Sequence, residues 1–525
     1  MKPSARRWSC LPLALAAIAF SPLALAQAPQ PPAPPRPGGP APGPAAPAPA
    51  EDVVAAALAP KPGGLTADDV ARTVAKTKHS VRAKQQDLKV AAARVDQAFV
   101  GFFPRVSLSA AYQRNSAVPT LGSGAGLIVD ATPSDLSANK VSSANNLLVY
   151  AIPAAPLNSY SFQASLSVPV SDYVLRISQN YAVASHNEKA KRFDLDAEVL
   201  QSQTDGKIAY FNWVRSRGQG VVARQAVDQA KAHVEDAKKT FNAGLISRAD
   251  VLRLEAQVAS AQQTVAEADS MTAVAGEQIR ILLQAPPDAP LEIGTDVINI
   301  AAAPPAESLA TAQEQALQRR LEIRALDETV FSLKQAESLA KAGYFPRIDA
   351  FADGVYANPN PRYFPALNQF DFTWDLGIRL SWTINDTFTT IGAAAEAKAR
   401  AASVAEQRLA LQDGLRTEVA SAHADAVKAP IVLEAAERGL ASAEESYRVR
   451  RELFKAGKAT GVDLVDAEGE VTRARLARLD AHIAILVARA RLDHATGRDA
   501  PNAAQGPEGP RNDGRAAPRQ VGSAR

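Results

Sequence analysis

The side chains that most often take part in catalysis or metal binding are sparse in this chain. Its only cysteine is Cys10, and a glycine-rich stretch around Gly122, Gly124 and Gly126 lacks the Lys-Ser/Thr pair of a phosphate-binding loop. The histidines are scattered, without metal-ligand spacing to one another or to the cysteine: His79, His186, His233, His423, His482 and His494. No nucleophile elbow or dinucleotide fingerprint occurs. We therefore expect no enzyme activity, no metal and no cofactor.

A turn-like motif with glycine and aspartate occurs twice. Phe241–Gly244, followed by Asp250, returns as Phe454–Gly457, followed by Asp463. A second motif, in which aromatic residues precede Pro-Arg, also occurs twice, at Pro104 and at Pro346. An internal repeat of this kind predicts two similar structural units that pack against each other.

Four segments alternate between apolar and polar residues, which predicts strands with one apolar face: 104–116, 158–170, 346–357 and 370–383. Each is long enough to cross a bilayer when tilted. Aromatic side chains gather near their ends: Phe102, Phe103, Tyr112, Tyr160, Phe345, Tyr356, Phe370 and Trp382. A soluble sheet covering a core is the alternative, but nothing else in the chain is patterned to cover it. We therefore favour a face that contacts membrane lipid.

The number of these strands has a consequence for assembly. The smallest transmembrane barrels have about eight strands, so four cannot close a barrel. Open sheet edges are excluded in lipid because their backbone groups would lack hydrogen bonds. The missing strands must come from other copies of the chain, so the strand count predicts an oligomer.

The two ends of the chain differ in composition from its middle. Residues 1–26 have a basic start, a short apolar stretch and a small-residue cleavage site, which is typical of a signal peptide. Residues 27–64 are rich in Pro and Ala and are expected to be a disordered leader, and residues 499–525 a disordered tail. The net charge of +3 gives no electrostatic reason to expect a nucleic-acid partner.

The middle of the chain divides into two repeats, 65–284 and 307–498, joined by a Pro-rich linker at 285–306. Each repeat is expected to begin with a helix, near 66–100 and near 308–342. The strand pair, a long helix and a returning helix follow in each. The expected long helices are 173–240 and 387–454, and the expected returning helices are 250–284 and 463–496.

The long helices are too long for one globular core. At 1.5 Å per residue each is a rod of roughly 100 Å, which must lie along other helices. The returning helices carry heptad-spaced apolar residues with alanine at one core position, as in a coiled coil. Pro430 predicts a kink in the second rod. The heptads alone would fit an ordinary soluble coiled coil.

Residues 65–498, with the duplicated Phe-Pro strand starts and the two Gly/Asp turns, resemble the TolC-type outer membrane efflux protein family. The resemblance implies a mixed membrane protein with an internally duplicated long α-helical coiled-coil barrel. Four amphipathic β-strands per chain would complete a trimeric 12-stranded transmembrane β-barrel. The Pro-rich linker would lie at mid-length of the helical barrel. The strand-to-strand loop that contains Gly122 would be a mobile external loop.

The same resemblance implies a function and a location. The chain would be a homotrimer in the outer membrane of a Gram-negative bacterium, in contact with outer membrane lipid, with its helical part forming a tunnel in the periplasm. It would be the porin-like exit duct of a tripartite efflux or type I secretion system. Substrates would pass passively from an inner-membrane pump and a periplasmic adaptor (membrane fusion) protein to the exterior. The alternative is a periplasmic coiled-coil adaptor or scaffold, which would need one helical hairpin flanked by β-rich domains.

The family also implies roles for residues at the two turns. Asp463 and Asp466 match the aspartates that constrict the channel, although helix N-capping is an alternative role for Asp463. The adaptor would dock on the tip turns, at Gly244, Asp250, Gly457 and Lys458. The tyrosine and arginine of the family's closing bonds are replaced here by Phe454 and Ala459. Lys458 is the candidate to substitute for them.

Overall fold

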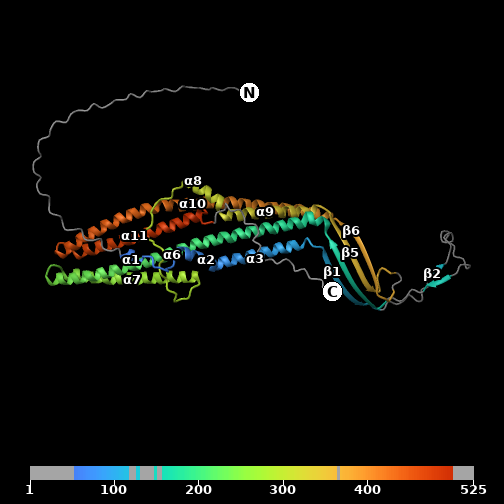
Figure 1. Cartoon of the computed structure of the whole chain (residues 1–525), viewed down its shortest axis with the longest axis horizontal. Coiled ribbons are helices and arrows are strands. Elements are labelled where there is room, and N and C mark those ends of the chain that lie inside the picture. Colours follow the sequence, from blue (N-terminus) through green and yellow to red (C-terminus); the bar gives the residue numbers. More distant parts are fainter. Residues whose placement is uncertain (1–52, 117–125, 130–146, 151–155, 364–366, 501–525) are drawn as a thin grey trace, which may run out of the picture. The chain divides into compact units, whose positions relative to one another are not determined.

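The computed structural model describes residues 53–116, 126–129, 147–150, 156–363 and 367–500. The expected signal peptide, most of the expected leader, most of the expected external loop and nearly all of the tail lie outside the described residues. Within these ranges the order helix, strands, long helix, returning helix occurs twice (Figure 1). In this part of the chain, no helix combines the length and apolarity needed to cross a bilayer.

One antiparallel sheet holds the four long strands in the order β1-β4-β5-β6. The strands are β1 (Arg105–Arg114), β4 (Asn158–Val168), β5 (Arg347–Asn358) and β6 (Asp371–Ser381). Their register places Leu108 opposite Ala164, Ala164 opposite Gly354, and Gly354 opposite Trp374. Residues of the same phase therefore share one face across both repeats. A further hairpin, β2 (Gly126–Val129) with β3 (Leu147–Tyr150), lies in the segment expected to be only a loop.

Two helical hairpins follow the strand pairs (Figure 1). In the first, α6 (Ser178–Asn242) packs along α7 (Arg248–Leu283), and in the second α10 (Ile384–Lys455) packs along α11 (Gly461–Ala495). The long helices have 65 and 72 residues, so each is a rod of roughly 100 Å. A short helix, α5 (Val170–Asp172), and a π-helical turn, η1 (Tyr173–Ile177), precede α6. Pro430 lies inside α10, which continues on both sides of it.

The first helix of each repeat is interrupted, which the sequence analysis did not anticipate. The expected helix near 66–100 is divided into α2 (Ala67–Thr77) and α3 (His79–Val100), and the one near 308–342 into α8 (Leu309–Arg319) and α9 (Leu321–Lys341). One basic residue separates the two halves each time: Lys78 with ψ 129° and Arg320 with ψ 125°. The break turns each side chain toward acids on a long helix, since Lys78 contacts Asp205 at 2.8 Å.

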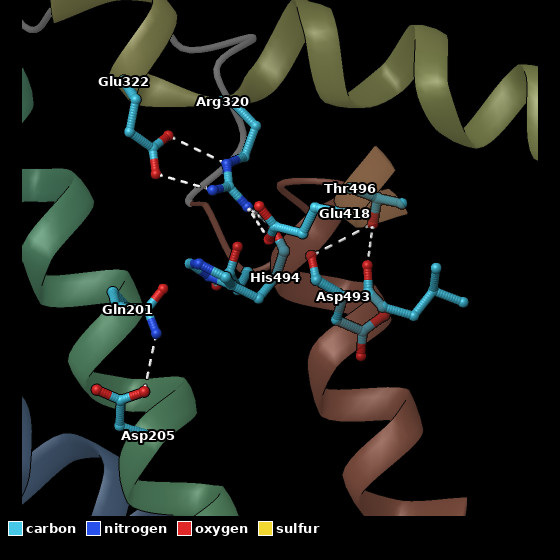
Figure 2. Close-up of polar contacts among 10 residues, drawn as sticks. Gln201, Asp205, Arg320, Glu322, Glu418, Asp493, His494 and Thr496 are labelled. Carbon is cyan, nitrogen blue, oxygen red and sulfur yellow. Dashed lines mark hydrogen bonds and ion pairs between the residues drawn. The ribbon is translucent and has the colours of Figure 1, made fainter. Parts of the chain in front are cut away.

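Figure 2 shows the corresponding network around Arg320. Its guanidinium donates two hydrogen bonds to Glu322, at 3.0 and 3.1 Å, and one to Glu418 on α10 at 3.0 Å. It also donates to the backbone carbonyl of His494 on α11 at 3.1 Å. Arg320 is buried, so these bonds offset the cost of removing its charge from water. The break between α8 and α9 is thereby joined to both helices of the second hairpin.

The last part of the expected leader is folded, which corrects the boundary at residue 64. Helix α1 (Val53–Ala57) precedes Leu58, and Val54 and Leu58 are buried in the same apolar cluster as Tyr210 and Leu479. The following residues join the Pro-rich linker, because the Lys61 N–H donates to the Ile293 carbonyl at 2.8 Å. A Cβ at Gly64 would collide with that carbonyl, so only glycine fits there. Burial of apolar side chains thus orders a segment whose composition suggested disorder.

Candidate functional site

The turn between α6 and α7 is built from a glycine and a capping box. After α6, Gly244 has φ +75°, a left-handed conformation that glycine adopts at little cost. The Ser247 hydroxyl oxygen then accepts a bond from the Asp250 N–H at 3.2 Å, and the Asp250 carboxylate accepts from the Ser247 N–H at 3.2 Å. These reciprocal bonds fix the start of α7. Hydrogen bonding from Ser247 lowers the pKa of Asp250.

The turn between α10 and α11 repeats this geometry. Gly457 has φ +68°, and the Thr460 hydroxyl oxygen accepts from the Asp463 N–H at 3.3 Å. One Asp463 carboxylate oxygen accepts from the Thr460 N–H at 3.0 Å and from its hydroxyl at 2.7 Å. Asp463 therefore has the capping role that was the alternative to a channel role. Hydrogen bonds from Thr460 lower the pKa of Asp463.

The two turns contact each other. The second carboxylate oxygen of Asp250 accepts a bond from the Gly461 N–H at 3.3 Å, at the first residue of α11. A Cβ at Gly457 would lie 3.6 Å from the Cβ of Leu245, so the chain segments between the helices are also neighbours. Asp250 thus caps α7 and places a negative charge at the N-terminus of α11, where the helix dipole favours it.

The remaining predicted tip residues lie on or beside α11. Asp466 is exposed about one turn beyond Asp463, and Lys458 is exposed in the turn itself. Phe454 is only 1% exposed and packs with Leu254 and Leu464, while Ala459 packs against the same cluster. At these two positions the chain has apolar packing between the hairpins instead of side-chain hydrogen bonds.

Behind the tip lies a buried polar group that the sequence analysis missed. The side chain of Glu468 on α11 is 3% exposed, and its carboxylate lies 3.9 Å from Nε2 of His233 on α6. That nitrogen and the hydroxyl of Tyr447 on α10 share a hydrogen bond of 2.7 Å. Burial raises the pKa of Glu468 to about 7. Burial, aided by the charge of Arg451, lowers the pKa of His233.

A sequence signal for Glu468 was present. It lies four residues after Leu464 and three before Val471, two residues of the apolar heptad seam, so it occupies the same stripe of α11. The signal did not identify the partners of Glu468, because His233 and Tyr447 are far away in the sequence.

The four-stranded sheet presents an apolar face to its surroundings. Trp374, Leu376 and Ile378 on β6 are 69%, 73% and 77% exposed. The same face carries further large exposed side chains: Val106, Leu108, Tyr112, Phe162, Leu166, Tyr356, Phe372 and Leu380. A patch of this extent is unusual on a protein surface in water and marks a binding or membrane face. In the described sheet, β1 pairs only with β4 and β6 only with β5, so both outer strands have an open edge.

Metal binding has no candidate site in the part of the chain that the structure describes. No group of three or more His, Cys, Asp or Glu side chains there is arranged to hold an ion. The candidate functional features are the tip turns, the Glu468 junction and the apolar sheet face.

A family model described as outer membrane efflux protein matches residues 71–283 and 312–498, which together are most of the chain. The two matched ranges coincide closely with the two repeats. No curated protein matches the chain.

Solved structures of outer-membrane channels have the same fold. CusC is 16% identical, with a TM-score of 0.69 over 82% of this chain and 92% of its own. VceC from Vibrio cholerae is 15% identical, with a TM-score of 0.65 over 82% and 96%. The open state of MtrE from Neisseria gonorrhoeae is 18% identical, with a TM-score of 0.64 over 82% and 88%. At these identities the likeness establishes the fold.

Proposed function

Because this chain belongs to the outer membrane efflux protein family, we propose that it is the exit duct of a tripartite efflux or type I secretion system. In this role it conducts substrates passively to the exterior, while an inner-membrane pump supplies the energy and a periplasmic adaptor joins the two. The family consists of channel proteins rather than enzymes, which agrees with the absence of catalytic motifs from the sequence.

The observation that carries this proposal is the open, apolar, four-stranded sheet. Its exposed face suits hydrocarbon, and its two open edges, on β1 and β6, need partners there. Three copies would join β1 of one chain to β6 of the next and close a barrel of twelve strands. The strands lead directly into rods of roughly 100 Å, which would extend the barrel into the periplasm as a helical tunnel.

At the tip, we propose that Asp463 and Asp466 form rings of carboxylates around the threefold axis. Rings of this kind favour cations and respond to divalent ions. Asp466 is the stronger contributor, because its exposed carboxylate lies outside the capping box that engages Asp463.

The adaptor would dock on the outer surface of the same turns. Gly244 and Gly457 give both turns a compact backbone without side chains, and Lys458 adds an exposed positive charge. Asp250 holds the two turns together, so it maintains the shape of the docking surface.

The alternative of a periplasmic adaptor or scaffold is not supported by the described architecture. An adaptor would need one hairpin between β-rich domains, whereas the described residues form two hairpins that follow two strand pairs.

Single-channel recording tests the proposal. The mature protein should be found in the outer membrane fraction of cells. After purification it should produce discrete, reproducible conductance steps in a planar lipid bilayer. A protein found entirely in the soluble periplasmic fraction, with no conductance after reconstitution, would exclude the exit-duct function.

A further inference from the structure

Glu468 lies where the two helical hairpins of one chain meet. It projects from α11 toward His233 on α6, and Tyr447 on α10 contacts the same histidine. Neither carboxyl oxygen of Glu468 has a hydrogen-bond partner among the described residues, and both are covered from solvent. A buried carboxylate without a partner is costly, whereas a protonated carboxyl group is much less so.

The charged and titratable groups around this junction come from all four helices. They are His233 and Asp236 on α6, Glu267 on α7, Tyr447, Arg451 and Lys455 on α10, and Arg475 on α11. The two arginines have other acidic contacts: Arg475 donates to Glu444 at 3.1 Å, and Arg451 donates to Glu452 at 3.3 Å. Among the residues that the structure describes, no basic group donates a hydrogen bond to Glu468.

A cavity of about 290 Å³ lies beside Glu468, between α6, α7 and α11. Its wall includes Glu468, Thr472 and Gln257, yet the carboxyl oxygens of Glu468 are hidden from it. An ionised Glu468 could reach water by turning into this cavity, which would disturb its packing against α6. Loss of the Glu468 proton could therefore loosen the packing between the two hairpins, because the cavity gives the ionised side chain a place to turn.

We propose that Glu468 is a proton-dependent lock between the α6–α7 hairpin and the α10–α11 hairpin. Protonated Glu468 permits close packing of the two hairpins behind the tip, and ionised Glu468 loosens it. The lock depends on the proposed channel function only for its effect on conduction, since the packing change is a property of the chain itself.

The direction of the pH effect follows from the burial. The pKa of Glu468 is raised to about 7. In the folded chain Glu468 is therefore mostly protonated below neutral pH, which holds the two hairpins together, and mostly ionised above it, which loosens them. Because burial lowers the pKa of His233, this histidine does not supply a compensating positive charge in that range.

Hydrogen–deuterium exchange of the purified full-length mature protein tests the lock. The peptides of interest cover 227–240 on α6 and 471–482 on α11, which exclude position 468. Glu468→Gln keeps the shape of the side chain without its titration. Glu470→Gln is the matched control, because Glu470 is exposed on the same helix two residues away. Wild type and variants are compared at the same pH, so the intrinsic exchange rates cancel.

At pH 4, below both the ordinary pKa of 4.5 and the raised pKa of Glu468, we expect all three proteins to show equal protection. At pH 8.5 we expect exchange at least fivefold faster in wild type and in Glu470→Gln than in Glu468→Gln. Equal protection of wild type and Glu468→Gln at pH 8.5 would overturn the lock, as would the same effect from Glu470→Gln. Because the readout is local packing, this outcome is separate from failure of the channel function, which conductance measures.

Discussion

Asp250 on α7 accepts a hydrogen bond of 3.3 Å from the backbone N–H of Gly461 on α11. This bond connects the tip turn of the first repeat to that of the second within one chain. The same carboxylate caps its own helix through Ser247, so one side chain defines both the start of α7 and the contact between the hairpins.

Replacing Asp250 should therefore lower the free energy of unfolding more than replacing Asp463, its counterpart in the other repeat. Asp250→Ala removes a cap and the bond to Gly461, with an expected loss of about 1–2 kcal/mol. Asp463→Ala removes only the equivalent cap and should destabilise the protein less. Denaturant unfolding of both variants would measure the difference. An Asp250→Ala effect no larger than that of Asp463→Ala would show that the bond between the turns contributes nothing.

The two tip aspartates should differ in their effect on ion conduction. Asp466→Asn should change the conductance and weaken divalent block, because its carboxylate is exposed and outside the capping box. Asp463→Asn should have the smaller effect. Single-channel recording with and without millimolar divalent ions measures both, with Glu470→Gln as the control. Undiminished divalent block in the variant that carries both Asp463→Asn and Asp466→Asn would contradict the proposed carboxylate rings.

The tip glycines should tolerate asparagine better than a bulky charged residue. Gly244→Arg places a large cation on the proposed docking surface and strains a backbone with φ +75°. Asparagine adopts this conformation more readily, so Gly244→Asn should retain most export. Export from cells and the oligomeric state of the purified protein should be measured together. Normal export by Gly244→Arg, with the oligomer intact, would refute docking at this turn.

Glu468 should make stability depend on pH. Its pKa is raised in the folded chain, so the folded state binds more protons than the unfolded state between pH 4.5 and about 7. Stability relative to Glu468→Gln should therefore fall as the pH rises through this range and level off above it, by about 3 kcal/mol in total. Thermal unfolding of both proteins across this range measures the change. A constant difference between them would contradict the raised pKa.

The buried Arg320 should stabilise the packing of α8 and α9 against the second helical hairpin. Arg320→Met removes four hydrogen bonds and leaves Glu322, Glu418 and the His494 carbonyl without this donor. We expect a loss of about 1–3 kcal/mol, measured by denaturant unfolding. Arg324→Met, at a neighbouring basic position with one weak backbone contact at 3.4 Å, is the control. Equal effects of the two changes would contradict the central role of Arg320.

Much of this fold is predictable because its signals are local. The observed strands begin and end within a few residues of the alternating segments, since alternation reports directly which face each side chain joins. Gly244 and Gly457 have the left-handed conformation that marks the ends of the long helices. Asp250 and Asp463 could be located in the sequence, but only the structure distinguishes the one that joins the two turns.

The features that escaped prediction depend on distant partners. Lys78 and Arg320 lie at the two helix breaks and contact acids on other helices, which no local pattern reveals. Residues 53–64 have a composition typical of disorder, yet Leu58 and Val54 are buried by a core formed much later in the chain. Glu468 lies on the apolar stripe of α11, but its neighbours His233 and Tyr447 come from other helices that are far away in the sequence.

The central claim is that neighbouring copies close the sheet, and disulfide cross-linking between its two outer strands tests it most directly. Within one chain β1 and β6 are separated by β4 and β5, three strand spacings or about 14 Å, which no disulfide can bridge. Cysteine pairs are placed on the polar face, at Ser107, Ser109 or Ala111 on β1 and at Thr373, Asp375 or Gly377 on β6. Closure predicts that at least one pair gives a covalent trimer in the outer membrane under oxidation, while each single cysteine gives none. A chain that remains monomeric with every pair, and is recovered in water without detergent, would contradict the claim.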